Sequence, residues 1–264
     1  MARLEKGIIL SHRQVAPEIY SLEFAAPALA RESSPGQFLQ VRTSPTHDPL
    51  LRRPLSLFDT EAERGVVTLL YRVVGRGTSL LAELPVDGLV DVMGPLGRGF
   101  SLPARPENVI LVGGGMGLAP LLFLGRMLKQ GGSEVNVLGG AADAQQLWAG
   151  NRFERLGIPF SPVTVDGSAG RQGLVTEFLA DWPGLDKVDR IYCCGPEAMM
   201  AAASKIAREH NVWGELSLEE HMACGVGACL GCARQLQPGD SGYVKICKDG
   251  PVFNMSEVQI FKLD

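Results

Sequence analysis

The stretch Asn108-Val-Ile-Leu-Val-Gly-Gly-Gly-Met-Gly-Leu-Ala-Pro120 decides the fold of this chain. Its first five residues are rich in β-formers and predict a buried strand. The glycines that follow predict a tight turn, and Pro120 fits the first turn of a helix because its missing N–H costs no hydrogen bond there. Glycine and proline disfavour a continuous helix, so these residues also argue against a membrane span in the uncharged run 109–125. The segment therefore predicts a strand, a turn and a helix in succession.

The chain after this segment keeps alternating between strand-like and helix-like runs. Strands are predicted over 134–140, 159–165 and 190–194. Helices are predicted over 118–132, 141–157, 174–182 and 196–210. Strands and helices of these lengths in alternation predict a parallel sheet that is covered by helices on both faces.

The first hundred residues have a different pattern. Short β-rich runs, such as 37–43 and 66–74, are separated by turn residues, which is typical of a small antiparallel barrel or sandwich. LPARPEN, over 102–108, is the natural linker, and the glycine- and cysteine-rich end of the chain is too short to form a core unaided. We therefore predict a mixed β and α/β fold in three domains: an antiparallel β-barrel over 1–102, a parallel α/β domain over 103–215 and a small domain over 216–264.

Composition narrows the class of protein. The chain has 264 residues, enough for about two domains at about 150 residues each. Its 25 basic and 29 acidic residues give a formal net charge of −4, which argues against a nucleic-acid partner. The opening, MARLEKGIIL, lacks the apolar stretch of a secretory signal, so we expect a cytoplasmic location and no membrane association. Clustered cysteines in that reducing compartment suggest metal binding and not disulfides.

Four cysteines near the C-terminus carry the strongest motif. Their spacing is C-x4-C-x2-C-x14-C, which is the plant-type [2Fe–2S] pattern; the predicted ligands are Cys224, Cys229, Cys232 and Cys247. Interspersed glycines allow backbone N–H groups to turn toward the sulfurs. The alternative is a structural zinc site, but such sites usually contain two C-x2-C pairs and this segment has one. His221 is predicted to be solvated or to lie next to the ligands without binding iron, because four thiolates already complete a diiron site.

A second motif is the glycine turn after the strand at 108–112. Glycines there let a pyrophosphate approach the start of the next helix; they are Gly113, Gly114, Gly115 and Gly117. Taken alone, the motif is equally compatible with a purely structural turn. A second strand-to-helix turn, Cys194-Gly195-Pro196, should open at the same carboxyl edge of the sheet, where ligands bind. We therefore predict that Gly195 and Pro196 contact a dinucleotide, that Cys194 lines a nicotinamide pocket as a catalytic residue, and that Cys193 lies in the core.

The predicted barrel contains a third group of motifs. A flavin dinucleotide needs backbone groups along its ring edge, and a cation and N–H donors at its pyrophosphate. Arg53 or Arg76 is the candidate cation. The residues predicted to bind FAD are Arg53, Pro54, Leu55, Ser56, Leu70, Tyr71, Arg72, Gly77 and Thr78. Each motif taken singly also fits a hairpin turn with a surface arginine.

Together these motifs resemble one family, the ferredoxin–NADP reductase-type flavoproteins with a C-terminal [2Fe–2S] domain, and within it the electron-transfer subunits of NAD-dependent dihydroorotate dehydrogenases. The similarity extends over essentially the whole chain. It rests on RRPLSL and YRVVGRGT for FAD, GGGMGLAP and CCGPEAMM for NAD, and MACGVGACLGC with KDGPVF for the cluster. Ferredoxin reductases generally carry an aromatic residue where this chain has Leu55, so Tyr71 becomes the expected stacking partner of the flavin.

The resemblance implies a division of labour between two subunits. Dihydroorotate would be oxidised at FMN in a separate (β/α)8-barrel subunit, and this chain has no residues to spare for such a barrel. Electrons would leave that FMN through the [2Fe–2S] cluster to FAD and then reach NAD⁺, in a heterotetramer of two copies of each subunit. The loop 225–228 would contribute to the interface. Asp143 and Asp166, in loops after the second and third sheet strands, favour NAD over NADP, which would call for arginines there.

Other functions remain open on the sequence. The chain is also compatible with the flavin subunit of a bifurcating ferredoxin–NADP reductase, a sulfide dehydrogenase or a hydrogenase, or with the reductase of an oxygenase. Some of those relatives replace the first cluster cysteine, so the intact Cys224 favours the dihydroorotate branch. A non-catalytic redox or metal sensor would leave the flavin and nucleotide motifs unexplained.

Overall fold

The computed structural model describes residues 2–235 and 242–258. The chain packs as two compact units that interleave in sequence: Met1–Gly99 with Glu219–Arg234 and Val244–Pro251, and Phe100–Leu218 with Gln235–Tyr243 and Val252–Asp264. Most of the cysteine-rich segment thus belongs to the same unit as the first hundred residues. The predicted three-domain boundaries stay a prediction.

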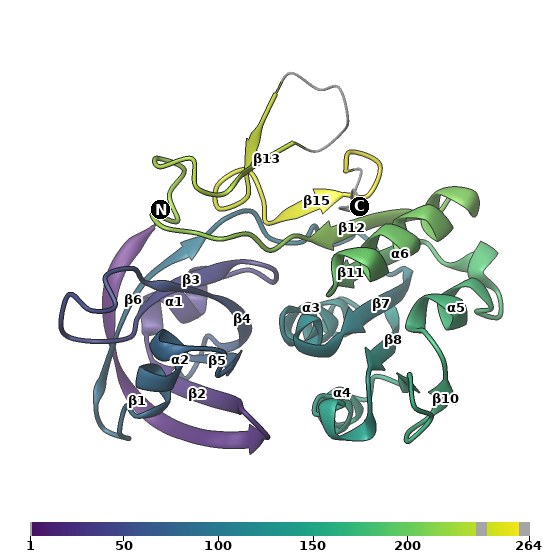
Figure 1. Ribbon diagram of the computed structural model, residues 1–264. Coiled ribbons are helices and arrows are strands. Elements are labelled where there is room, and N and C mark those ends of the chain that lie inside the picture. The colour runs from purple at the N-terminus through teal and green to yellow at the C-terminus, as the bar shows by residue number, and fades with distance from the viewer. Residues whose placement is uncertain (1, 236–241, 259–264) are drawn as a thin grey trace. The chain divides into compact units, whose positions relative to one another are not determined.

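The first unit is built on a closed antiparallel barrel, which confirms the predicted fold class of this region (Figure 1). The strands follow the order β1-β2-β5-β4-β3-β6; they are β1 (Arg3–Ala16), β2 (Ile19–Ala25), β3 (Phe38–Arg42), β4 (Arg53–Glu61), β5 (Val66–Arg72) and β6 (Leu89–Leu96). Two short helices, α1 (Pro27–Glu32) and α2 (Arg76–Ala82), connect them. Leu22, Leu39, Val41 and Leu57 are fully buried in its core.

The cysteine-rich segment packs against this barrel. It contains a two-stranded sheet of β13 (Ala233–Arg234) and β14 (Val244–Lys245). At the end of β6, Arg98 forms a parallel bridge with Pro251, and a Cβ on Gly97 would lie 2.6 Å from the Gly250 carbonyl oxygen. Since Gly97 also has a φ of +76°, this junction requires glycine on both steric and conformational grounds.

The second unit is a seven-stranded sheet in the order β10-β9-β8-β7-β11-β12-β15. The strands are β7 (Asn108–Gly114), β8 (Glu134–Ala141), β9 (Phe160–Thr164), β10 (Arg171–Gln172), β11 (Arg190–Cys194), β12 (Trp213–Ser217) and β15 (Val252–Asn254). All neighbours are parallel except β12 and β15, which run antiparallel. The predicted parallel α/β fold is confirmed.

Helices cover both faces of this sheet, as predicted (Figure 1). The helices are α3 (Leu118–Gln130), α4 (Gly150–Arg155), α5 (Val175–Ala180) and α6 (Glu197–Glu209). Single 3₁₀ turns are formed by η1 (Gly115–Gly117), η2 (Ala144–Gln146) and η3 (Leu185–Lys187). Helix α3 packs against β7 and β8 and contacts α4, whereas α5 and α6 contact each other. The strand order reverses between β7 and β11, so the loops after these two strands flank the crevice where such sheets bind ligands.

One predicted helix is wrong in extent. The run 141–157 is predicted to form a single helix, but it divides into η2 and α4. The Asp143 carboxylate accepts hydrogen bonds from the backbone N–H groups of Gln145 and Gln146, at 2.9 and 3.2 Å, and so caps the short 3₁₀ turn. Asp side chains compete with helical hydrogen bonding in this way, and Gly150 weakens the helix further.

Among the described residues, every helix is too short or too polar to span a lipid bilayer.

Candidate functional site

The four predicted cluster cysteines all belong to the first unit, and their thiols lie in two pairs. The Cys229 N–H donates to Cys224 Sγ at 3.4 Å, and the Cys247 N–H donates to Cys232 Sγ at 3.5 Å. The Cys229 side chain also influences the pKa of Cys224, and the Cys232 side chain that of Cys247. Cys232 and Cys247 are buried, whereas Cys229 is exposed. Within residues 2–235 and 242–258, no three metal-ligating side chains converge on the position of a single ion. Two thiol pairs fit a diiron cluster, in which each iron takes two protein thiolates.

Backbone N–H groups surround these sulfurs. The Cys224 Sγ accepts from the N–H groups of Val226, Ala228 and Cys229 at 3.5, 3.3 and 3.4 Å. Desolvation raises the pKa of the Cys224 thiol, but these donors together outweigh it and lower the pKa to about 6. The loop thus favours the thiolate form that binds iron.

The more buried pair behaves differently. Burial, reinforced by the neighbouring Cys232, raises the pKa of the Cys247 thiol to about 12, although Gly227 N–H donates to its sulfur at 3.2 Å. Gly227 adopts a φ of +79°, a conformation that favours glycine and turns this N–H toward the sulfur. His221 is exposed, as predicted for a solvated residue.

The residues predicted to bind FAD meet where β4 begins and α2 begins. Four consecutive residues of β4, Arg53–Ser56, are half-buried, whereas the next two are buried. A Cβ on Gly77 would lie 2.6 Å from Arg53 Nε, so the guanidinium lies directly against the first turn of α2. The Thr78 hydroxyl accepts from the N–H of Val74 at 3.0 Å and stabilises that turn. The structure therefore brings Arg53, Gly77 and Thr78 together.

Arg53 differs from its neighbours in how its charge is balanced. Arg52 is paired with Asp91 at 2.8 Å, and Arg76 with Asp48 at 2.7 Å. In the described part of the chain Arg53 has no carboxylate at ion-pair distance, and its guanidinium donates to the Leu51 carbonyl oxygen at 2.6 Å. Of the two candidate cations, Arg53 is thus the one whose charge is not already neutralised.

The β5 residues of the predicted FAD set occupy different environments. Arg72 is half-buried, and Leu70 and Tyr71 are buried. The Tyr71 ring is 2% exposed and stacks on Tyr20 at 5.9 Å between centroids, and its hydroxyl lies 2.7 Å from His12 Nε2. Burial raises the pKa of this hydroxyl well above its ordinary value. Neighbouring side chains therefore already pack against the Tyr71 ring. Its expected stacking on a flavin stays a prediction.

The second unit brings the two glycine turns into contact, at the edge where the strand order reverses. Cys194 pairs with Gly113 across β11 and β7. A Cβ on Gly117 would collide with the Cys194 carbonyl oxygen, and one on Gly195 would lie 2.9 Å from Gly114 N. Gly115 has a φ of +54° and open space where a Cβ would project. At Gly115 the backbone is therefore open to the approach of a phosphate group.

The remaining residues of this edge are placed as follows. Cys194 is nearly buried and Cys193 is fully buried, and burial raises the pKa of the Cys193 thiol well above its ordinary value, as befits a core residue. Pro196 directly precedes α6, and a Cβ on Gly114 would lie 2.8 Å from its Cδ. At the neighbouring loops, Ser168 hydrogen bonds lower the pKa of the exposed Asp166.

Comparison with known proteins decides the family. Residues 6–100 match the model of the oxidoreductase FAD-binding domain, and residues 219–259 match that of the iron-sulfur cluster binding domain of dihydroorotate dehydrogenase B. The dihydroorotate dehydrogenase B (NAD(+)) electron transfer subunit of Desulforamulus reducens is 41% identical, with 96% of this chain and 97% of that protein covered. The subunit of the same name from Shouchella clausii is 42% identical, with 95% and 96% covered. This chain belongs to the family of dihydroorotate dehydrogenase B electron transfer subunits.

A solved structure adds a relative outside this family of electron transfer subunits. A chain of the NADH-dependent reduced ferredoxin–NADP oxidoreductase, studied for flavin-based electron bifurcation, superimposes with a TM-score of 0.84 at 30% identity; 96% of this chain and 90% of that chain are covered. The ferredoxin-reductase-like architecture of the electron transfer subunits is thus shared with other flavin systems.

Two residues at these sites were not predicted. Met199 of α6 lies against both glycine turns, since its Sδ would be 2.8 Å from a Cβ on Gly114. Gln40 of β3 lies against the cluster loop at Gly225. The only sequence signal for Gln40 is an amide within the otherwise apolar run 38–41, whereas Met199 lies within the CCGPEAMM motif but was not itself predicted to have a role.

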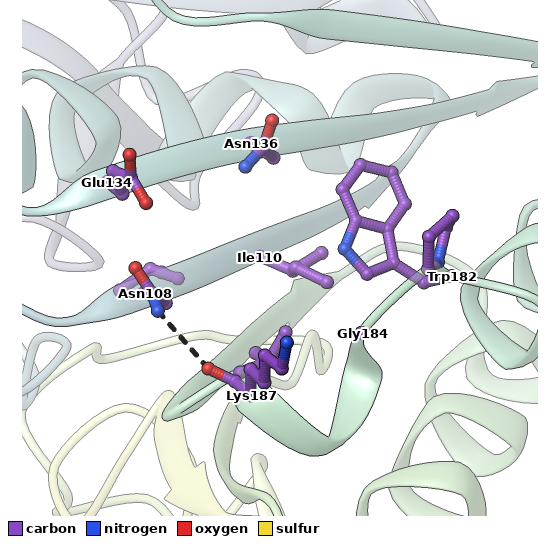
Figure 2. Close-up of a pocket in the computed structure, with 10 residues that line it drawn as sticks. Asn108, Ile110, Glu134, Asn136, Trp182, Gly184 and Lys187 are labelled. Atoms are coloured by element: carbon purple, nitrogen blue, oxygen red, sulfur yellow. Dashed lines mark hydrogen bonds between the residues drawn. The ribbon is translucent and has the colours of Figure 1, made fainter.

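A further cavity lies at the opposite end of the sheet from the glycine turns. It has a volume of about 440 Å³ and is lined by the amino ends of β7 and β8 and by the segment before β11. Figure 2 shows Asn108, Asn136 and Trp182 around it, with a hydrogen bond of 3.2 Å from Asn108 Nδ2 to the Lys187 carbonyl oxygen. None of the predicted site residues lines this cavity.

Proposed function

We propose that this chain is the electron-transfer subunit of an NAD-dependent dihydroorotate dehydrogenase. The full-length similarity to curated subunits of that name carries the proposal. The bound groups supply the redox chemistry: a [2Fe–2S] cluster carries one electron at a time, and FAD exchanges one or two electrons and passes hydride to NAD⁺.

The cluster ligands are Cys224, Cys229, Cys232 and Cys247. Their N–H donors stabilise the negative charge of the sulfurs and hold the loop in one conformation. Beside them Val226 and Leu230 expose 46% and 62% of their surface. These two residues, with the loop 225–228, form the surface that receives the partner.

The flavin site is formed at β4, β5 and the start of α2. Arg53 neutralises the pyrophosphate, Gly77 and Thr78 supply backbone N–H donors, and the strand residues provide backbone groups along the flavin ring. The strand residues in this role are Pro54, Leu55, Ser56, Leu70, Tyr71 and Arg72.

The nicotinamide nucleotide is NAD, bound at the β7 and β11 loops. The glycines Gly113, Gly114, Gly115, Gly117 and Gly195 with Pro196 accommodate the pyrophosphate. Cys194 lines the nicotinamide pocket as the catalytic residue. Asp143 and Asp166 lie in the loops that would face a 2′-phosphate and disfavour NADP.

The partner is an FMN-containing catalytic subunit in a cytoplasmic heterotetramer of two copies of each chain. Oxidation of dihydroorotate to orotate releases two electrons and two protons. NAD⁺ takes both electrons and one proton to become NADH, and the second proton goes to solvent.

The decisive experiment combines this chain with an FMN-containing dihydroorotate dehydrogenase subunit from the same source. We expect a stable complex that forms NADH from NAD⁺ and dihydroorotate, with flavin and iron in this chain. A colourless chain, or a chain with zinc and no flavin, would contradict the proposal.

The second candidate is a subunit of a bifurcating ferredoxin–NADP reductase, favoured by the structural similarity at a TM-score of 0.84. In that case the chain would co-purify with a partner that oxidises reduced ferredoxin and reduces NADP⁺, in place of one that oxidises dihydroorotate.

A further inference from the structure

Gln40 is a buried amide without a hydrogen-bond partner. It lies in β3, is 0% exposed, and neither its Nε2 nor its Oε1 is hydrogen-bonded within the described residues. Buried polar groups in folded proteins are almost always paired, so an orphaned carboxamide calls for a partner that the protein chain does not supply.

The position of Gln40 indicates which group that is. Its β3 neighbours Leu39 and Val41 are buried in the barrel core, and alternation along the strand turns Gln40 to the outer face. There it meets the cluster loop: a Cβ on Gly225 would lie 2.7 Å from Gln40 Cγ and 2.9 Å from its Nε2. Gly225 has a φ of +70° and directly follows Cys224. Conformation and space both require glycine where the loop passes over this amide.

We propose that Gln40 is a positioning residue of the iron–sulfur site, and that its Nε2–H donates a hydrogen bond to an inorganic sulfide of the cluster. The inference rests on the proposed function, since it requires the cluster. Hydrogen bonds to the sulfurs of such clusters stabilise the more negative, reduced form and raise the reduction potential. Gln40 therefore sets how readily this site accepts an electron.

The flavin is an alternative partner for the Gln40 carboxamide, because β4, which pairs with β3, is predicted to bind it. Gln40 pairs with Pro54 of β4, a residue predicted to bind FAD. A carboxamide that bonded the flavin would change the potential of the flavin and leave that of the cluster unaltered. The two assignments are thus separated by measuring both potentials in the same protein.

The test uses the full chain with flavin and cluster bound. Gln40→Met keeps the length and approximate volume of the side chain and removes the donor. Gln40→Glu replaces the donor with a carboxylate oxygen. Ser21→Ala serves as the matched control, because Ser21 is also buried with an unpartnered side-chain oxygen but lies on β2, which is not a neighbour of β3.

Redox titration followed by electron paramagnetic resonance and visible absorption gives the cluster and flavin potentials separately. We expect Gln40→Met to retain its iron. The ratio of reduced to oxidised cluster at a given solution potential should fall about tenfold, which corresponds to a fall of about 59 mV in the reduction potential of this one-electron couple. Gln40→Glu should lower the cluster potential further, and Ser21→Ala should change neither the cluster potential nor the flavin potential. A wild-type cluster potential in Gln40→Met with full iron content, or a shift in the flavin potential alone, overturns the proposal.

A second measurement needs no substitution. With ¹⁵N placed selectively in glutamine side chains, the reduced wild-type cluster should show a hyperfine coupling to one side-chain nitrogen, and its absence overturns the proposal even if no Gln40 variant folds. A wild-type chain without any cluster signal would instead refute the proposed function.

Discussion

Replacing Arg53 with alanine tests the assignment of the flavin site most directly. The Arg53 guanidinium lies against Gly77 at the start of α2, and no carboxylate in the described part of the chain balances its charge. One N–H group is already used, since it donates to the Leu51 carbonyl oxygen at 2.6 Å. The Nε and the other terminal nitrogen face Gly77 and remain for a pyrophosphate.

The size of the effect follows from the kind of bond that is lost. A hydrogen bond to a charged group contributes about 1.5–3 kcal/mol. Since each 1.4 kcal/mol is a factor of ten in affinity, Arg53→Ala should raise the dissociation constant of FAD about 10- to 150-fold. Folding should change little, because the side chain lies at the surface of β4 and its loss leaves the barrel core intact.

Flavin fluorescence provides the assay, because FAD that leaves the protein becomes brighter when protein quenching is lost. Dilution series of the wild type and Arg53→Ala give the two dissociation constants, and urea unfolding checks that both barrels are equally stable. Arg76→Ala is the control, since Arg76 is exposed and already paired with Asp48. Equal affinity in Arg53→Ala, or a larger loss in Arg76→Ala, would refute the assignment of Arg53 as the cation.

The other predictions concern the cluster, the nucleotide edge and the barrel core. Cys229→Ser should abolish the [2Fe–2S] electron paramagnetic resonance signal; an unchanged spectrum would exclude Cys229 as a ligand. Cys194→Ala should slow flavin reduction by NADH in stopped-flow measurements with FAD still bound, and a wild-type rate would leave Cys194 as a core residue. Gly117→Ala should destabilise the chain by about 1–3 kcal/mol in urea unfolding, because its Cβ would collide with the Cys194 carbonyl, whereas wild-type stability would show that the two turns can separate without cost. Tyr71→Phe should cost about 1 kcal/mol by the same measurement, since it removes the hydrogen bond to His12; no loss would mean that this bond is not formed in solution.

Much of the fold was predictable because each element carries its own local signal. The apolar run and glycine turn at 108–117 appear as β7 and η1, and the spacing of the four cysteines predicted thiols that the structure brings into two pairs. Such signals depend on neighbours in sequence, so they survive without knowledge of the packing.

Long-range contacts could not be predicted in the same way. The sequence separates Gln40 from Gly225 and Arg98 from Pro251, and only the structure brings these pairs together. The sequence alone likewise gives no sign that most of the cysteine-rich segment packs in one unit with the barrel. The prediction of a single helix over 141–157 was wrong for a local reason. The Asp143 carboxylate caps a short turn there, and the prediction gave this capping ability less weight than the helix-forming residues around it.

The position of β3 explains how two cofactor sites can be held at a fixed separation. On its outer face, β3 presents Gln40 to the cluster loop, and on its edge the same residue pairs with Pro54 at the start of the predicted flavin strand. A slip of one residue in this ladder would turn Gln40 into the core and Leu39 out of it, so the buried apolar side chains fix the register. Because the cluster cysteines and the predicted flavin residues all belong to the first unit, their separation is set within one compact body.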